Sequence, residues 1–167
     1  MHYVARFSER IKALFPRLPI LLLLDGLYAN GPVMQRCHQY HWDFMIVLKD
    51  QDLSTVWEEY HALHAVQPNY FHRHWGRRRQ RFSWVNAIAY AFDQRGRGRG
   101  RRHLRLHVVV CEETWEVVDA QGNTLTKTAR HAWLSSQPLN RDNLHERCNL
   151  AARYRWGIEA NFLVEKH

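Results

Sequence analysis

The sequence predicts an α/β fold in which a parallel βαβ layer with flanking helices carries an antiparallel β-rich insertion. Residues 1–64 alternate helical spacing with short continuous apolar runs, the pattern of helices packed on a buried parallel sheet. Residues 65–138 instead alternate apolar and polar side chains with a period of two, which is typical of antiparallel strands. A helical pattern returns after this segment. We therefore divide the chain into an α/β part, residues 1–64 and 139–167, and a basic β-rich insertion, residues 65–138.

The amino-terminal part is predicted to begin with a helix and a strand. Apolar residues at 4, 7, 11, 14 and 15 follow the i, i+3, i+4 spacing of a helix, and Pro16 ends it. Residues 20–24 form a continuous apolar run, which predicts a buried parallel strand. Asn30, Gly31 and Pro32 then favour the start of a second helix, with Pro in its first turn.

A second strand and a third helix complete this part. Residues 44–48 predict another buried strand, which ends at Lys49. Asp52 is the expected N-cap of the following helix. The apolar face of that helix consists of Leu53, Val56, Trp57, Tyr60 and Leu63. This order of helices and strands predicts a right-handed parallel layer.

The insertion is predicted to consist of hairpins. The expected strands are residues 82–92, 104–110, 115–118, 125–128 and 132–135. Between the first two lie residues 93–102, which alternate Arg with Gly and are expected to form a flexible hairpin tip. Residues 121–123, Gln-Gly-Asn, provide the turn of the second hairpin.

The carboxyl-terminal part is predicted to be helical from Asn140, the expected N-cap, to Lys166. The chain ends one residue later, and no Gly, Pro or polar tail provides a stop signal before that end. We therefore expect that the polypeptide is cut within a longer helix.

Composition limits the class of protein. The 167 residues include 46% hydrophobic and 24% charged residues, which excludes a disordered or fibrous chain. Lys and Arg number 24 against 16 Asp and Glu, so the formal net charge is +8. Residues 73–105 alone hold eleven Arg and one acid, Asp93, which is a local charge of +10. The basic segment predicts an acidic partner such as a nucleic acid.

The sequence does not have the pattern of a secreted or membrane protein. The longest apolar run, residues 18–24, contains Pro19 and is far shorter than the ~20 residues of a membrane-spanning helix. It also lacks the small-residue cleavage site of a signal peptide. The three cysteines have no CxxC spacing, and the paired histidines do not lie beside cysteines at zinc-finger spacing. We expect a cytoplasmic protein with reduced thiols and no membrane partner.

Asp25 is a candidate metal ligand. It ends the first apolar strand and precedes Gly26, and the carboxyl end of a parallel strand is where α/β folds place ligands. One interpretation is a polar residue that only marks the end of the strand. The other is a metal-binding carboxylate on a rigid element.

A second candidate constellation lies in the last helix. Arg155, Glu159, Phe162 and Lys166 fall within an arc of about 60° on one helix face. Such a row can be a solvated set of salt bridges. It can also be a phosphodiester site, in which Glu159 holds a divalent ion while Arg155 and Lys166 contact the phosphate backbone.

Together these segments resemble the DDE transposases of bacterial insertion sequences. Residues 21–29, Leu-Leu-Leu-Leu-Asp-Gly-Leu-Tyr-Ala, followed by a strand that ends at Lys49, are similar to the region of the family's second catalytic acid. Residues 155–166 resemble its third-acid signature, Tyr-x2-Arg-x3-Glu-x6-Lys. The resemblance covers nearly the whole chain, including a β-rich insertion before the helix that bears the Glu. It implies an incomplete RNase H-like core.

The chain departs from the family pattern in two places. Ala152 stands where the signature has Tyr, although Tyr154 lies close by. The first catalytic Asp has no matching position, because in that fold it lies on a hairpin strand before the first helix. Asp50 and Asp52 can be offered as substitutes, with Asp25 as the first acid. The helix and strand that precede Asp25 match the second-acid position instead.

The resemblance implies the chemistry of DNA transposition. Asp25 and Glu159 would be catalytic and metal-binding, and two Mg²⁺ or Mn²⁺ ions about 3.5–4 Å apart would activate the nucleophile and stabilise the leaving oxygen. The implied partners are DNA, as transposon ends and target, and the intact transposase, in the cytoplasm and associated with the nucleoid. With one of three acids missing, we expect a transposase fragment that is inactive alone.

The arginine-rich tract has two interpretations, a solvated flexible loop or a surface that follows DNA phosphates. On the second interpretation, the predicted DNA-binding residues of the chain are Lys49, Arg95, Arg97, Arg99, Arg101, Arg102, Arg155 and Lys166. The alternative to a transposase fragment is a small basic nucleic-acid-binding module without catalysis.

Overall fold

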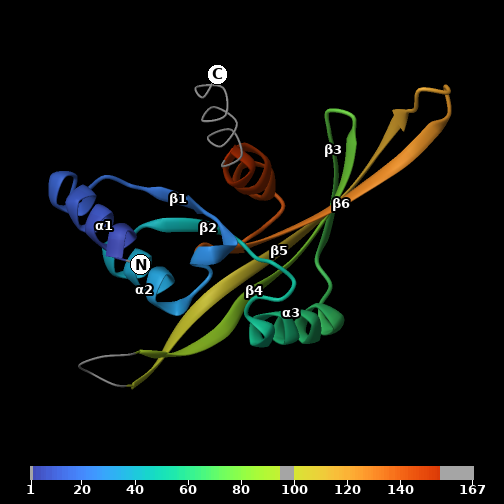
Figure 1. Ribbon diagram of the computed structural model, residues 1–167. Helices are drawn as coiled ribbons and strands as arrows, with labels where there is room; N and C mark the ends of the chain where they lie inside the picture. The colour runs from blue at the N-terminus through green and yellow to red at the C-terminus, as the bar shows by residue number, and fades with distance from the viewer. Residues whose placement is uncertain (1, 95–99, 155–167) are drawn as a thin grey trace.

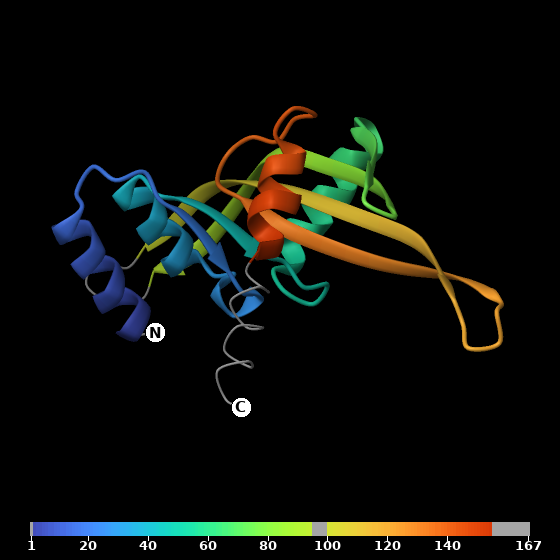
Figure 2. The same cartoon turned by 90° about the horizontal axis from the view of Figure 1, so that it is seen from above.

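The computed structural model describes residues 2–94 and 100–154, which form a mixed α/β structure around one six-stranded sheet (Figures 1 and 2). The elements are α1 (His2–Leu14), β1 (Leu21–Leu24), η1 (Gly26–Tyr28), α2 (Gly31–Tyr40), β2 (Asp43–Val47), α3 (Ser54–Val66), β3 (Tyr70–Trp75), β4 (Arg78–Gln94), β5 (Gly100–Val118), β6 (Thr124–Ser135), η2 (His145–Ala151) and η3 (Ala152–Tyr154). Their order in the sheet is β1-β2-β6-β5-β4-β3.

The α/β part contains the predicted parallel pair. Strands β1 and β2 are parallel, with Leu21 opposite Asp43 and Leu24 opposite Ile46. β2 is buried along its centre, as predicted. β1 is not fully buried, since it lies at the edge of the sheet and Leu21 is 39% exposed. The prediction of a buried strand was therefore wrong for β1, because continuous apolar runs do not show which strand lies at an edge.

The other strands form an antiparallel meander of long hairpins. β5 runs without interruption over both segments predicted as separate strands, and β6 likewise joins residues 125–128 to 132–135. β3 was missed because its sequence, Tyr-Phe-His-Arg-His-Trp, shows no alternation of apolar and polar residues. Arg101 and Arg102 belong to β5, opposite Asp93 and Phe92, so this part of the predicted flexible tip is regular strand.

Strand β6 connects the parallel and antiparallel parts. It pairs with β2 through Met45 opposite Ser135 and Val47 opposite Trp133, and with β5 along the rest of its length. The strands of the predicted insertion thus continue the sheet of the α/β part. The β4–β5 and β5–β6 hairpins extend toward opposite ends of the molecule (Figure 1).

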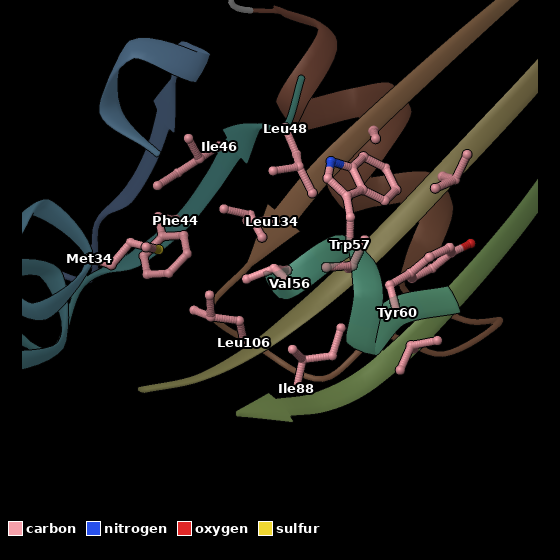
Figure 3. Packing of buried hydrophobic residues seen from close by; sticks show 14 of the residues in the cluster. Met34, Phe44, Ile46, Leu48, Val56, Trp57, Tyr60, Ile88, Leu106 and Leu134 are labelled. Carbon is pink, nitrogen blue, oxygen red and sulfur yellow. The ribbon is translucent and has the colours of Figure 1, made fainter. Parts of the chain in front are cut away.

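Two apolar cores lie on the two faces of this sheet. The first packs α2 and α3 on one face, and its buried members include Met34, Val56 and Leu134 (Figure 3). The second lies beneath η2 on the opposite face, with Leu144 and Cys148 at its centre. Alternate residues of β5 enter alternate cores, since side chains of a strand point to opposite faces in turn. Figure 1 shows η2 above the sheet and α3 below it.

Of the three predicted helix caps, the structure confirms one. The Asn30 side chain accepts a hydrogen bond from the Val33 N–H at 3.2 Å, as an N-cap should. The cap predicted at Asn140 is wrong, because η2 begins after Leu144 without a side-chain cap, and Asn140 instead accepts from the N–H groups of Asp142 and Asn143, at 2.9 and 3.0 Å, in the turn before it. The cap predicted at Asp52 is wrong, because α3 begins after Leu53, which adopts a left-handed conformation without a side-chain cap. Among the described residues, no helix is long and apolar enough to cross a membrane.

Gly31 is required where the β4–β5 hairpin contacts α2. A Cβ at this position would overlap the ring of Phe92, and Gly31 also forms a backbone hydrogen bond with the Tyr90 hydroxyl. We expect Gly31→Ala to lower the free energy of unfolding by about 1–3 kcal/mol, because the ring must leave its position. Urea denaturation measures this loss. The double variant Gly31→Ala/Phe92→Ala is the control, and additive losses would contradict the proposed clash.

Candidate functional site

Asp25 lies at the carboxyl end of the parallel pair, where the sequence placed it. Its Oδ1 accepts a hydrogen bond from the Gly26 N–H at 2.6 Å, so the side chain caps the short helix η1. The Tyr28 N–H closes the same turn on the Asp25 carbonyl at 2.9 Å. The side chain is partly exposed. Asp25 therefore has a structural role as the cap of this short helix.

Lys49 and Asp52 gather at the same edge of the sheet. A Cβ on Gly26 would lie 2.9 Å from the Lys49 Cε and 3.3 Å from Asp52 Oδ2, so both side chains pack against the residue that follows Asp25. The Asp52 N–H donates to the Lys49 carbonyl at 3.0 Å, and the Trp57 indole donates to the same carbonyl at 3.0 Å. The loop after β2 is thus held in place, with a cation and a carboxylate next to η1.

The acid Asp50 points to another partner. It forms an ion pair with Arg130 of β6, whose guanidinium also lies over the Trp57 ring at 5.0 Å. Of the two acids offered as substitutes, Asp52 is therefore the one beside Gly26.

The described residues provide only part of the predicted site. Within residues 2–94 and 100–154, no group of three or more His, Cys, Asp and Glu could hold a metal ion. The predicted residues Glu159, Arg155, Lys166, Arg95, Arg97 and Arg99 lie outside the described residues. Arg101 and Arg102 lie near the start of β2, where they line a cleft with Trp42 and Asp43, whereas Lys49 follows its end.

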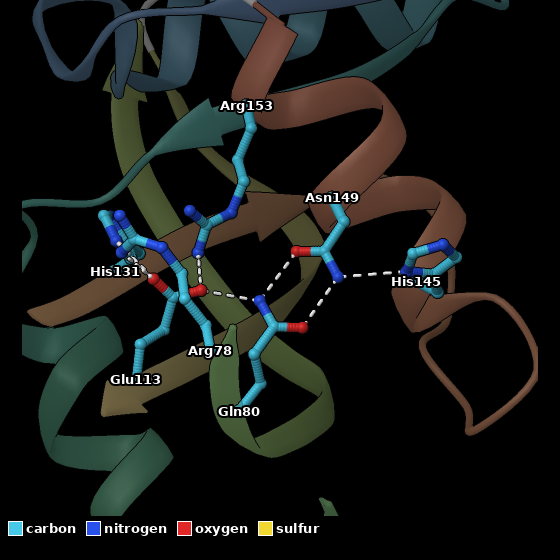
Figure 4. Close-up of polar contacts among 7 residues, drawn as sticks. All are labelled: Arg78, Gln80, Glu113, His131, His145, Asn149 and Arg153. Atoms are coloured by element: carbon cyan, nitrogen blue, oxygen red, sulfur yellow. Dashed lines mark hydrogen bonds and ion pairs between the residues drawn. The ribbon is translucent and has the colours of Figure 1, made fainter. Parts of the chain in front are cut away.

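A buried polar network that the sequence analysis missed surrounds Glu113 of β5 (Figure 4). It lies on the face of the sheet that carries the second core. Glu113 is 1% exposed. Its carboxylate accepts hydrogen bonds from Gln80 Nε2 at 2.6 Å and from Arg78 at 2.8 Å, and it forms an ion pair with Arg153. Gln80 and Asn149 exchange two hydrogen bonds, at 2.9 and 2.8 Å. The period-two pattern of β5 is the available signal, since Glu113 occupies an inward position among apolar residues.

The two arginines of this network each lie over an aromatic ring. Arg78 lies 4.0 Å above the Trp115 ring, and Arg153 lies 4.9 Å from the centroid of Trp75. Cations stacked on aromatic faces retain their attraction while shielded from water. The network is therefore a packed element that unites β3, β4, β5 and the helical segment η2–η3.

The ionisation of the network is well defined. Burial alone would raise the pKa of Glu113, but the hydrogen bond from Gln80 and the charge of Arg153, followed by Arg78, outweigh it and lower the pKa. Burial and the charge of Arg153 lower the pKa of His131, so its contact with Glu113 at 3.7 Å is not an ion pair at neutral pH. With two arginines bound to it, Glu113 is not available as a metal ligand.

The network fixes the start of the segment that leads to Glu159. Arg153 in η3 and Asn149 in η2 are both held by side chains of the sheet, and η2 also covers the second core. The helical turns before residue 155 are thus attached to β4 and β5 by buried polar groups.

Comparisons with known proteins give no assignment. No protein-family model matches the sequence, and no curated protein is significantly similar to it.

Glu113→Gln tests the weight of this network. We expect the variant to lose about 3–5 kcal/mol of stability near neutral pH, because Arg78 and Arg153 lose their buried counter-charge. The pKa of Glu113 is lower in the folded protein than its ordinary value of 4.5, so the ionised carboxylate stabilises the fold fully at pH values above 4.5. This stabilisation is lost as the pH falls from 4.5 through the pKa of the folded state. The difference between wild type and variant should therefore shrink below pH 4.5 in urea denaturation.

The neighbouring Glu112→Gln is the matched control. Glu112 is 46% exposed in its side chain and pairs with Arg81 at 2.6 Å. Its loss should cost less than about 1 kcal/mol. Equal losses for the two variants, or a pH-independent difference for Glu113→Gln, would contradict the assigned role of Glu113.

Proposed function

We propose that this chain is part of a DDE transposase of the bacterial insertion-sequence type, with an incomplete RNase H-like core that carries a β-rich insertion. The observation that carries the proposal is the position of Asp25 at the carboxyl end of β1, next to a parallel β2 that is followed by Lys49. In α/β sheets this edge is where functional groups from neighbouring loops meet. The sequence resemblance of residues 155–166 to the third-acid signature supports the same assignment.

The proposed chemistry is metal-dependent cleavage and transfer of DNA strands. Asp25 and Glu159 would hold Mg²⁺ or Mn²⁺, which would activate the attacking oxygen and stabilise the leaving one. Lys49 would contact phosphate beside Asp25, and Arg155 and Lys166 would do so from the last segment of the chain. The basic strand residues Arg101 and Arg102, with Arg95, Arg97 and Arg99, would bind DNA away from the metal ions.

The alternative is a basic nucleic-acid-binding module without catalysis. The hydrogen bond from the Gly26 N–H to Asp25 favours it, since a capping role accounts for an Asp at this position without a metal. The two functions differ in one property, whether Asp25 binds a divalent ion together with Glu159.

Metal-directed cleavage of the polypeptide distinguishes these two functions. With Fe²⁺ in place of Mg²⁺, ascorbate and peroxide generate radicals that cut the backbone beside a bound ion. We expect fragments that end near residue 25 and near residue 159, and we expect both to disappear in Asp25→Asn because the ion loses a ligand. Mass spectrometry of the fragments is the measurement.

The exposed Asp142→Asn is the control and should leave the cleavage pattern unchanged. Cleavage at one position alone, or a pattern that persists in Asp25→Asn, would favour the binding module. The proposed fragment should not cut terminal-repeat DNA by itself with Mg²⁺ or Mn²⁺, and robust strand cleavage would contradict the absence of a first acid.

A further inference from the structure

A cleft opens in the sheet where β6 ends. Ser135, the last residue of β6, is opposite both His107 of β5 and Met45 of β2. The chain then leaves the sheet, so within residues 2–94 and 100–154 the part of β5 before His107 pairs with β4 on one side and with no strand on the other. A cleft of about 770 Å³ lies there, between β5, the start of β2 and the end of α2. Its volume is in the range of sites that bind small molecules.

The walls of the cleft are cationic. Its lining contains three arginines of β5, four histidines and a single acid. The arginines are Arg101, Arg102 and Arg105. The acid, Asp43, accepts hydrogen bonds from Ser136 Oγ at 3.0 Å and from Gln137 Nε2 at 2.8 Å, so its Oδ1 is already bound to the wall.

The arginines supply the positive charge at neutral pH. Burial and the charges of Arg105 and Arg147 lower the pKa of His107 to about 4, so this histidine is neutral. Arg101 faces Asp93 across the β4–β5 ladder, whereas Arg105 faces Ala89. The basic character of the cleft thus does not depend on acidic conditions.

The floor of the cleft is apolar. Met34, Phe44 and Leu106 line it and are buried members of the first core. Since neighbouring strands lie about 4.8 Å apart, β2 and β5 are roughly two such spacings apart where β6 ends. A duplex is too wide for this gap, because the depths of its two grooves, about 8.5 and 7.5 Å, already add up to about 16 Å across.

We propose that this cleft binds a single-stranded segment of nucleic acid, with its phosphates on the arginines and its sugars and bases over the apolar floor. Positively charged grooves with apolar or aromatic surface are the general means by which proteins hold single strands without sequence preference. The inference rests on the nucleic-acid-binding part of the proposed function. It does not require Asp25 or a metal ion.

Fluorescence anisotropy with labelled oligothymidylate and with a duplex tests the proposal. In Arg101→Ala/Arg105→Ala we expect single-strand affinity to fall at least tenfold and the salt dependence to weaken by about 1.4 in log–log slope, the value for two lost phosphate contacts. Arg77→Ala/Arg79→Ala is the matched control, since it removes the same charge from exposed positions of the same basic segment. It should change single-strand affinity less than twofold.

Two further substitutions, each nearly isosteric, distinguish an effect of charge in the cleft from an effect of the protein's net charge. Gln35→Glu places an acid in the cleft lining and should weaken single-strand binding, whereas Gln121→Glu, in the β5–β6 turn, should not. Urea midpoints verify that each variant is folded.

Three outcomes would overturn the proposal. The first is an equal loss of single-strand affinity in the cleft and control variants. The second is a wild-type protein that binds duplex but no single strand. The third is displacement of the oligonucleotide by polyglutamate at equal charge. The last result would assign the cleft to an acidic peptide. The two proposals can fail separately. If the cleft variants still bind duplex DNA, the proposed function stands and only the cleft proposal is affected. If the cleft binds single strands but Asp25 binds no metal ion, the cleft proposal stands and the transposase proposal fails.

Discussion

The double pairing of β6 is the constraint on which the rest of the structure depends. Through Ser135 and Trp133 this strand bonds to β2 on one side and to β5 on the other, which makes one sheet of a parallel pair and a long antiparallel meander. Both apolar cores cross this seam, since Leu134 belongs to the first core and Trp133 to the second. The place where β6 stops also determines where the sheet opens into a cleft.

The second core needs polar as well as apolar contacts to hold its helical segment. Leu144 and Cys148 pack on the sheet, but apolar contacts are not directional and do not by themselves fix the position of a short helix. The paired amides of Gln80 and Asn149 and the Glu113–Arg153 ion pair allow only one position, because any displacement leaves a buried donor or charge without its partner. Burial of polar groups thus fixes the direction in which the chain approaches residue 155.

The sequence predicted the parallel pair, the helices and the main hairpins, because each depends on local periodicity. Asn30 was found as a cap for the same reason. The burial of β1, the cap at Asp52 and the strand β3 were not predictable in this way, since they depend on which strands become neighbours. Glu113 and the cleft were missed because both join residues that are distant in the chain, and Asp25 was placed correctly because the end of a strand is a local feature.

The two candidate regions lie at opposite ends of β2, and this separation has a consequence for how DNA would be bound. From Asp43 to Lys49 the backbone advances roughly 20 Å at about 3.3 Å per residue. A single strand that kept the stacked rise of duplex DNA, about 3.4 Å per nucleotide, would span that length in roughly six nucleotides, and an extended strand in fewer. If both proposals hold, about this length would separate the segment held by Arg105 from the phosphodiester at Asp25. The cleft would then select for melted DNA, and the carboxylates would act at a fixed distance from the held segment.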